Sequence, residues 1–571
     1  MGPEPVTEEG PTRPAAEVPA AVPSVSVASG AGGAEPRSIG RAGRAAGAVA
    51  ALEPYLIVFL ASAAGLVIEI VAARLLAPVV GVSLYTWTSI IGIVLAGISL
   101  GNFLGGVIAD RGASRGLLGA ILGVAAVMST AVLPLVAVVP GWLADLPIVA
   151  RIVLVTTLLF FLPSMLLAMV SPIVIKLQLR DLGKTGKVVG RLYAVSTFGA
   201  IAGVFLTGFV LVQWIGSRTT VAVIAVALLL MALLFGRLWR FRPGPAGDGK
   251  LRSILRALLW FRSGAVVVVV AVGAMFGYAV RGGYFRTPCV DESAYYCIKI
   301  NDGPEGTTNM KALVLDQLVH SYVSLDAPTD LSKYGYEEVF SEVAEHVAAR
   351  SAGFRSLFIG GGGYVLPRYF EVTYPESRIE VIEIDPAVTR AVYQYLGLWA
   401  DSRIVTFNED ARMRVPRLEP GRYNVVVGDA FNDVSVPYHL TTREFNESVR
   451  DLLAPGGVYV VNIVDRPHSG EFLRSFVHTM RQTFPHVTLL NADGNWFNDL
   501  RSTTVVMGSN IEITRNDLDE AARRMGKAAA TAHLIAPAVL EELVTERRAT
   551  LLTDDHAPVD QMLAPLYLES R

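Results

Sequence analysis

A series of long apolar runs between residues 55 and 280 constrains the fold of this sequence more than any other feature. They lie at 55–80, 85–109, 117–139, 150–172, 190–214, 219–236 and 263–280. An α-helix needs about 20 apolar residues to cross the hydrocarbon core of a bilayer, and these seven runs are close to that length. Only 18% of the 571 residues are charged, against about 25% in average proteins. We therefore expect a multi-pass helical membrane domain over residues 51–282, with the lipid bilayer as its partner.

Two details of these runs bear on helix packing and function. Gly97, Gly101 and Gly105 recur every four residues, a spacing that lets membrane helices approach closely. Glu69 and Arg74 lie within the first run, and charges at such depth are costly and often functional. Because five positions separate them, they lie roughly 140° apart around a helix and are not expected to pair. Either they have a structural role, with Arg74 extending to the interface, or they serve transport or docking.

The charges of the connecting segments predict an orientation. Most Lys and Arg residues of this region lie around 37–44, 111–115, 176–187 and 237–262, whereas the alternate connections hold Arg151 and Arg218. The positive-inside rule places the first group, and the N-terminus, in the cytoplasm. Seven crossings then place the chain after about residue 281 outside the cell membrane. Residues 1–50 are rich in Pro, Ala and Gly and are expected to be a disordered tail.

The two cysteines, Cys289 and Cys297, follow the last apolar run. On an oxidising side of the membrane they would form a disulfide that closes a small loop. The alternative is a pair of unrelated, partly buried thiols.

The second half of the chain alternates short apolar strands with amphipathic helical stretches. The predicted strands lie at 357–360, 379–384, 404–407, 425–428 and 458–464. This alternation predicts a parallel sheet with helices on both faces, in an α/β domain over residues 351–571. Segments 487–491 and 503–507 are expected to close it as an antiparallel pair. Segments 294–300 and 311–315 predict a hairpin in a small β module, which with a linking helix occupies 285–350.

Glycines and acidic residues follow the first three predicted strands. The first strand ends in Gly360, Gly361, Gly362 and Gly363, which permit a tight turn close to a ligand. Glu383, about 20 residues later, can accept hydrogen bonds from ribose hydroxyls. Asp410, next to Ala411 after the third strand, can accept a hydrogen bond from the amine of an adenine. The pattern predicts a nucleoside ligand, and the lack of a following Lys-Ser/Thr pair argues against a triphosphate.

Three polar residues, Asp429, Asn432 and Asp433, follow the fourth strand. Ligands of open α/β sheets bind at this edge, although these residues also suit helix caps and turn amides. The net charge is only −2, so no overall basic field indicates a nucleic-acid partner.

Residues from about 290 to 510 resemble the polyamine aminopropyltransferases, the spermidine synthase family. The matching stretches are 292–298, 315–317, 357–362, 381–385, 410–411 and the strand that ends at Asp429. The apolar half resembles the integral-membrane branch of that family, through the helix ending Ala109-Asp110-Arg111 and the stretch 552–559.

The resemblance implies a class I methyltransferase-like fold with a small N-terminal β module. It implies transfer of an aminopropyl group from decarboxylated S-adenosylmethionine to putrescine or a similar amine, giving spermidine and methylthioadenosine. It also implies roles for residues of the sheet edge: Asp429 accepts the proton of the amine, Gly360, Gly361, Gly362 and Glu383 hold the nucleoside, and Asp410 and Ala411 hold the adenine. Neither a permanently bound cofactor nor a metal is expected.

The amine-binding positions depart from the family pattern. The residues expected there are Tyr296, His320, Glu337, Gly363, Asn432 and Asp433. Gly363 stands where the family has an Asp, and Asn432 stands where it has a second Asp. The nucleoside-binding positions are therefore better kept than those for the amine.

Two other functions are consistent with the sequence. One is a transferase or sensor that binds an adenosyl nucleoside and a different second substrate. The other is a transporter for polyamines with the soluble domain as its binding module. A homodimer is a further expectation.

Overall fold

The computed structural model describes the chain from residue 41 onward, with short gaps. The described residues are 41–179, 183, 185–236, 250–351, 353–430, 436–492, 496–545 and 549–569. Helix α1 (Arg41–Val80) begins within the segment expected to be a tail, so residues 41–50 are helical. The expected disorder of residues 1–40 lies outside the described residues.

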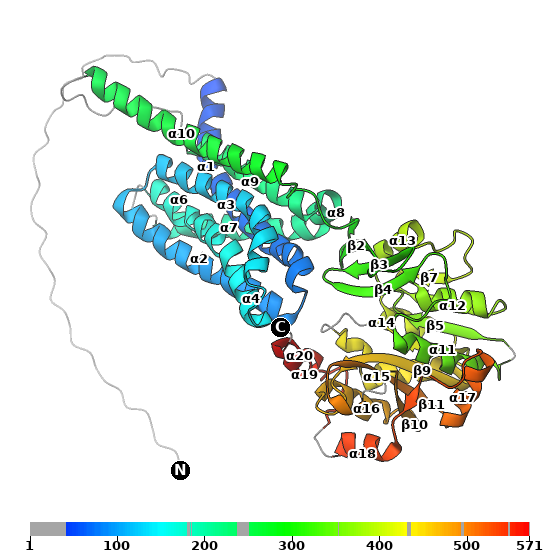
Figure 1. The fold of residues 1–571 in the computed structure, drawn as a ribbon. Coiled ribbons are helices and arrows are strands. Elements are labelled where there is room, and N and C mark those ends of the chain that lie inside the picture. The colour runs from blue at the N-terminus through cyan, green and yellow to red at the C-terminus, as the bar shows by residue number, and fades with distance from the viewer. Residues whose placement is uncertain are drawn as a thin grey trace, which may run out of the picture. The chain divides into compact units, whose positions relative to one another are not determined.

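The described residues between Arg41 and Arg281 are mostly helical (Figure 1). After α1 come α2 (Leu84–Gly112), α3 (Arg115–Trp142), α4 (Ile148–Thr156), η1 (Thr157–Phe161), α5 (Leu162–Ala168), α6 (Val170–Gln178), α7 (Thr185–Leu206), η3 (Thr207–Leu211), α8 (Val212–Ile215), α9 (Ser217–Phe235) and α10 (Lys250–Arg281). Within the described residues, six helical stretches are long and apolar enough to cross a membrane, which confirms six of the seven expected spans. The seventh run lies in α10, whose described apolar part, Val266–Arg281, is shorter.

Small residues bring α2 against the α4–α6 segment, as their spacing predicts. A Cβ atom at Gly97 would lie 2.9 Å from the carbonyl oxygen of Phe161, and one at Gly105 would lie 2.8 Å from the Cα atom of Met169. Real Cβ atoms do not approach that closely, so larger residues at these positions would force the helices apart.

A four-stranded antiparallel sheet follows the helices. Its strands, in spatial order, are β1 (Asp291–Glu292), β2 (Cys297–Asp302), β3 (Met310–Leu315) and β4 (Leu318–Ser324). The predicted hairpin is confirmed as β2 and β3, whereas β4 was not predicted because His320 and Ser321 interrupt its apolar pattern. Helix α11 (Gly335–Ala348) leads to the larger sheet.

The larger sheet has eight strands in the order β12-β10-β11-β9-β8-β5-β6-β7. They are β5 (Arg355–Ile359), β6 (Arg378–Ile382), β7 (Val405–Phe407), β8 (Tyr423–Gly428), β9 (Leu453–Asp465), β10 (His486–Asn491), β11 (Ser502–Ser509) and β12 (His533–Leu534). Strands β5 to β9 pair in parallel, and β11 is antiparallel to both β9 and β10. The predicted parallel sheet and its antiparallel end are both confirmed.

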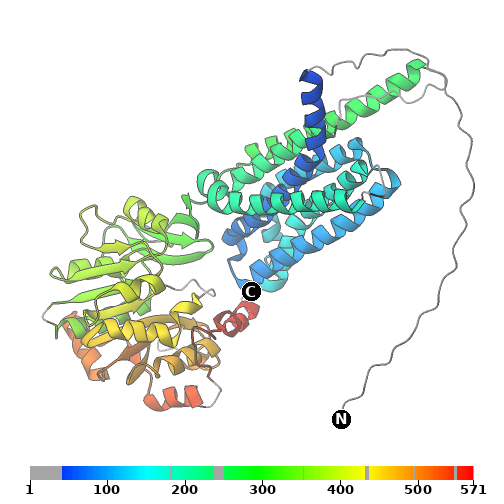
Figure 2. The same ribbon diagram turned by 180° about the vertical axis from the view of Figure 1, so that it is seen from behind.

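Helices cover both faces of this sheet (Figures 1 and 2). Besides α11, the helices of this half are α12 (Val365–Thr373), α13 (Pro386–Tyr395), α14 (Ala411–Arg414), α15 (Arg443–Leu452), α16 (Glu471–Met480), α17 (Arg515–Arg524), α18 (Pro537–Thr545), α19 (Val559–Met562) and α20 (Ala564–Glu569), with short turns at η4 (Val415–Arg417), η5 (Tyr438–Leu440) and η6 (Trp496–Asn498). Successive residues of a strand face opposite sides. Thus Val425 and Val427 of β8 lie in one buried cluster with Phe340 of α11, whereas Val426 lies in the other with Phe445 of α15.

Strand β5 lies between β6 and β8 although it precedes both in the chain. The chain therefore leaves β5 toward one side of the sheet and later returns on the other. Ligands of doubly wound sheets bind where the strand order reverses in this way, at the carboxyl ends of the strands.

Candidate active site

Two neighbouring cavities lie at the carboxyl ends of β5, β6 and β8. The first, about 260 Å³, contains Glu383 and is called the Glu383 cavity. The second, about 300 Å³, contains Tyr336 and is called the Tyr336 cavity. Their linings share His320, Gly360, Gly362 and Asp429, so a ligand in each would meet the other at Asp429.

The glycine loop, residues 360–363, follows β5 and lies against the residues that follow β6 and β8. Gly360 has a φ angle of +100°, and a Cβ atom there would lie 2.8 Å from the carbonyl carbon of Asp429. The Gly360 amide donates to the carbonyl of Ile382, and the Asp429 amide donates to that of Ile359, each over 2.9 Å. Glycine is thus required at this position for Asp429 to lie against β5.

Glu383 directly follows β6 and lines the Glu383 cavity. Its carboxylate accepts hydrogen bonds from the amides of Gly361 at 2.9 Å and Asp385 at 3.0 Å. Burial raises its pKa, and these amide bonds act in the opposite direction. Asp385 instead accepts from the Ala387 amide at the start of α13 and from the Ser293 hydroxyl. Of the two carboxylates that follow β6, Glu383 is the one that lines the cavity.

Asp410 and Ala411 also line the Glu383 cavity. The Asp410 side chain accepts from the Arg412 amide at 2.7 Å, which caps α14. His439, from the η5 turn, has its Nε2 atom 3.5 Å from the Asp410 carboxylate and also lines this cavity. Nothing in the local sequence identified His439, because its contact with Asp410 exists only after the chain folds.

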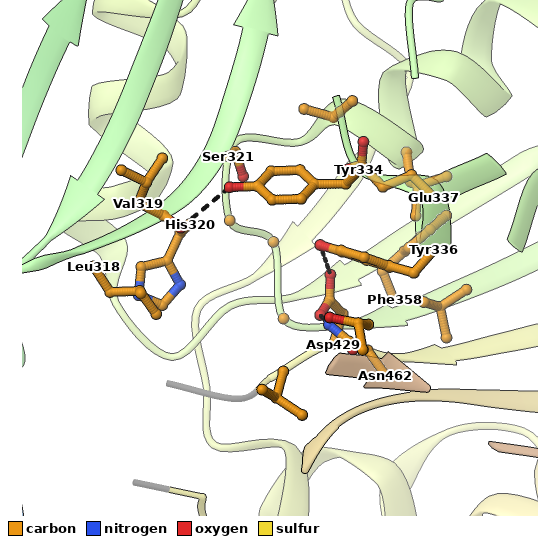
Figure 3. A pocket seen from close by; sticks show the side chains of 18 of the residues that line it. Leu318, Val319, His320, Ser321, Tyr334, Tyr336, Glu337, Phe358, Asp429 and Asn462 are labelled. Carbon is orange, nitrogen blue, oxygen red and sulfur yellow. Dashed lines mark hydrogen bonds between the residues drawn. The ribbon is translucent and has the colours of Figure 1, made fainter. Parts of the chain in front are cut away.

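Asp429 follows β8 and faces the Tyr336 cavity (Figure 3). Its carboxylate accepts hydrogen bonds from the Asn462 side-chain amide at 3.0 Å and from the Tyr336 hydroxyl at 3.4 Å. Burial raises the pKa of Asp429, and both bonds oppose that rise. Asn462 was not identified from the sequence, although a lone polar residue within the apolar strand β9 was the available signal.

The start of α11 supplies the remaining wall of the Tyr336 cavity. Tyr334, Tyr336 and Glu337 all line it, and the rings of the two tyrosines lie 5.6 Å apart. Burial, together with the negative charge of Asp429, raises the pKa of Glu337 well above its usual range. The cavity therefore combines aromatic faces with two carboxyl groups, a lining that suits an amine.

One family of known proteins matches part of this chain. Residues 336–492 match the family described as the spermine/spermidine synthase domain. This segment of the chain is thus similar to the spermine/spermidine synthase domain. The matched segment includes the glycine loop, Glu383, Asp410, Asp429 and Asn462.

Individual relatives resemble parts of the chain. A polyamine aminopropyltransferase of Vibrio vulnificus is 36% identical over 110 residues, which are 19% of this chain and 37% of that protein. A probable polyamine aminopropyl transferase of Bifidobacterium longum is 27% identical over 218 residues, which are 36% of this chain and 48% of that protein. The chain thus spans less than half the length of these two relatives. The crystal structure of a probable spermidine synthase from Corynebacterium glutamicum aligns with 47% of this chain and 96% of that one, at 24% identity and a TM-score of 0.41.

The structure distributes the expected amine-binding residues unevenly between the two cavities. His320 and Glu337 line the Tyr336 cavity, whereas Tyr296 lines the Glu383 cavity instead. Gly363 lines neither of these cavities, because its amide donates to the Ser321 hydroxyl at 2.9 Å and its Cα atom packs against β4. Asn432 and Asp433 lie outside the described residues.

Over the described ranges, no group of three or more His, Cys, Asp or Glu side chains converges as a metal site would require. The homodimer expected from the sequence stays a prediction.

Proposed function

We propose that this protein is a membrane-anchored aminopropyltransferase. It transfers an aminopropyl group from decarboxylated S-adenosylmethionine to putrescine or a similar amine, and releases methylthioadenosine and spermidine. The position of Asp429 supports this proposal most directly, because one buried carboxylate borders both cavities. A two-substrate transfer needs such a group where the nucleophile meets the electrophile.

Each cavity suits one substrate. In the proposed complex the adenosyl group occupies the Glu383 cavity, with Glu383 accepting hydrogen bonds from the ribose hydroxyls and Asp410 facing the adenine. The amine occupies the Tyr336 cavity, where tyrosine faces and carboxylates favour a cation. The sulfonium carbon then points toward Asp429.

Proton transfer to Asp429 enables the reaction. The amine arrives as an ammonium ion and attacks only after losing a proton, which the Asp429 carboxylate accepts. The nitrogen lone pair forms the new N–C bond as the C–S bond breaks. The electron pair of the broken bond goes to sulfur, which leaves as the neutral thioether of methylthioadenosine. Burial supports this role of Asp429, because a raised pKa makes its carboxylate a better proton acceptor.

The proposal is tested by assaying the purified protein with decarboxylated S-adenosylmethionine and putrescine, cadaverine or spermidine. We expect release of methylthioadenosine that depends on the amine. If the protein binds the nucleoside but releases no methylthioadenosine with any of the three amines, the second substrate is a different one. Absence of both binding and release would refute the proposal.

The pH dependence of kcat tests the ionisation of Asp429. Because the ionised form accepts the proton and burial raises its pKa, activity should fall on acidification at a pH above the usual aspartate value of about 3.9. The Asn462 amide lowers this pKa by its hydrogen bond. Replacing Asn462 with Ala should therefore move the acidic limb of the plot of kcat against pH to higher pH. An unmoved or lower limb would contradict this role of Asn462.

The side of the membrane is part of the same proposal. Cys289 and Cys297 form a disulfide with Cα atoms 5.3 Å apart, and disulfides persist mainly in oxidising compartments. This bond supports an extracytoplasmic synthase domain, an orientation that also requires α10 to cross the membrane as the seventh span expected from the sequence. In cells, a reporter fused to the C-terminus should be active outside the cytoplasm. Alkylating reagents should not modify Cys289 and Cys297, because both are oxidised in the disulfide. A reporter active only in the cytoplasm would overturn this orientation.

A further inference from the structure

The segment between the two cysteines forms one wall of the Glu383 cavity. Tyr295 and Tyr296 line that cavity together with Asp410 and Ala411. Residues 293–296 form the tip of the segment. Ser293 organises this tip, because its hydroxyl oxygen accepts hydrogen bonds from the amides of Tyr295 at 3.0 Å and Tyr296 at 2.9 Å. The same hydroxyl donates to Asp385, next to the proposed ribose-binding Glu383. The position of this tip therefore determines the shape of the cavity.

Arg74, near the end of α1, contacts the tip from the helical half of the chain. Its guanidinium donates to the carbonyl of Tyr295 at 2.9 Å and to the carbonyl of Ser293 at 2.6 Å. In the described part of the chain it makes these contacts instead of an ion pair with Glu69, as their angular separation predicted. A guanidinium holds its donors in a rigid plane, so these two bonds fix the tip in one orientation.

The rest of the segment is held independently of Arg74. The disulfide joins its two ends. Glu292 accepts from the Ser217 amide at 2.9 Å, and Asp291 pairs with Arg390 at 2.9 Å. Loss of the Arg74 side chain should therefore release only the tip and leave the segment attached to the domain.

From these contacts we infer that Arg74 is a positioning residue for the nucleoside, and that α1 thereby sets the affinity of the synthase domain for its adenosyl substrate. This inference rests on the proposed nucleoside site. It gives the apolar half of the chain a function beyond anchoring, because a residue of a candidate membrane span holds a wall of the site. Arg74 acts through the tip and does not touch the substrate.

The test measures methylthioadenosine binding to the full-length protein in lipid nanodiscs. The variants are Arg74→Ala and Arg74→Lys, and the control is Lys311→Ala. Lys311 pairs with Asp302 at 2.7 Å on the exposed side of the small sheet and lines neither cavity. Loss of two charge-assisted hydrogen bonds should raise the Kd of Arg74→Ala about ten-fold or more. Arg74→Lys keeps one positively charged donor, so its affinity should lie between those of Arg74→Ala and the wild type. Lys311→Ala should bind methylthioadenosine like the wild type.

Kinetics separate positioning from a general structural effect. In Arg74→Ala the KM for decarboxylated S-adenosylmethionine should rise about as much as the Kd, while kcat at saturation and the KM for the amine stay near wild type. A fall in kcat with an unchanged nucleoside Kd would overturn the inference.

The remaining outcomes are distinguishable. Wild-type protein that binds no adenosyl nucleoside would refute the proposed function itself. Wild-type protein that binds, together with folded Arg74→Ala of equal affinity, would refute only the role of Arg74. Should Arg74→Ala fail to fold, Arg74→Gln, which keeps much of the side-chain volume without the paired donors, decides by the same criterion of affinity.

Discussion

Replacing Asp429 with Asn is expected to lower the rate of aminopropyl transfer by about 10²- to 10⁴-fold, the usual contribution of a general base. The amide keeps the shape of the side chain and can still accept a hydrogen bond from Asn462, but it cannot take a proton from the ammonium group. The Kd for methylthioadenosine should change little, because Glu383 and Asp410 are untouched. Single-turnover release of methylthioadenosine in the presence of putrescine measures the chemical step directly.

Asp465→Asn is the matched control for this substitution. Asp465 is also a buried carboxyl group at the end of a strand, with a pKa raised to about 6 by burial. It accepts from the amides of Arg466 at 2.8 Å and Leu473 at 2.9 Å, and it lines neither cavity. Its replacement should lower the free energy of unfolding by about 1–3 kcal/mol and leave kcat unchanged. Equal losses of kcat in both variants would contradict a base role for Asp429.

Replacing Glu383 with Gln is expected to weaken methylthioadenosine binding by about 10- to 100-fold, since a hydrogen bond to a charged group contributes about 1.5–3 kcal/mol. The carboxylate accepts from the Gly361 and Asp385 amides, and in the proposed complex it also accepts from the ribose. A glutamine has one acceptor atom in place of two and turns an NH₂ group toward one of these donors. Titration calorimetry with methylthioadenosine measures the change in Kd.

Glu380→Gln provides the comparison for Glu383. Glu380 lies on β6, which ends one residue before Glu383, is also buried, and accepts hydrogen bonds from the Tyr423 hydroxyl and from Arg378. It lines neither cavity, so its replacement should affect stability without changing nucleoside affinity. Comparable losses of affinity in the two variants would show that strand β6, and not the Glu383 carboxylate, controls binding.

Much of the fold follows from local sequence patterns. The length of an apolar run decides whether a helix can cross a bilayer, and the expected spans match six described helices closely. Strands β5 to β11 were predicted because short apolar segments between polar turns have few alternatives. Strand β4 was missed, since His320 and Ser321 belong to a cavity lining and to a glycine-loop contact instead of a regular apolar face.

Part of the candidate site was also predictable. Gly360, Glu383, Asp410 and Asp429 each follow a predicted strand, and parallel strands bring their carboxyl ends to one edge. Spacing alone was therefore enough to place these four residues together, and the structure has all four in the lining of one cavity.

The sequence by itself determined six spans, strands β5 to β11 and the carboxylates at the sheet edge, because run length, alternation and position after a strand are local properties. Only the tertiary structure decided which side chains complete the site. Tyr336 meets Asp429 across 93 residues and Asn462 meets it across 33. Arg74 reaches Tyr295 across 221 residues. Such contacts depend on strand order and helix packing, which no local pattern encodes.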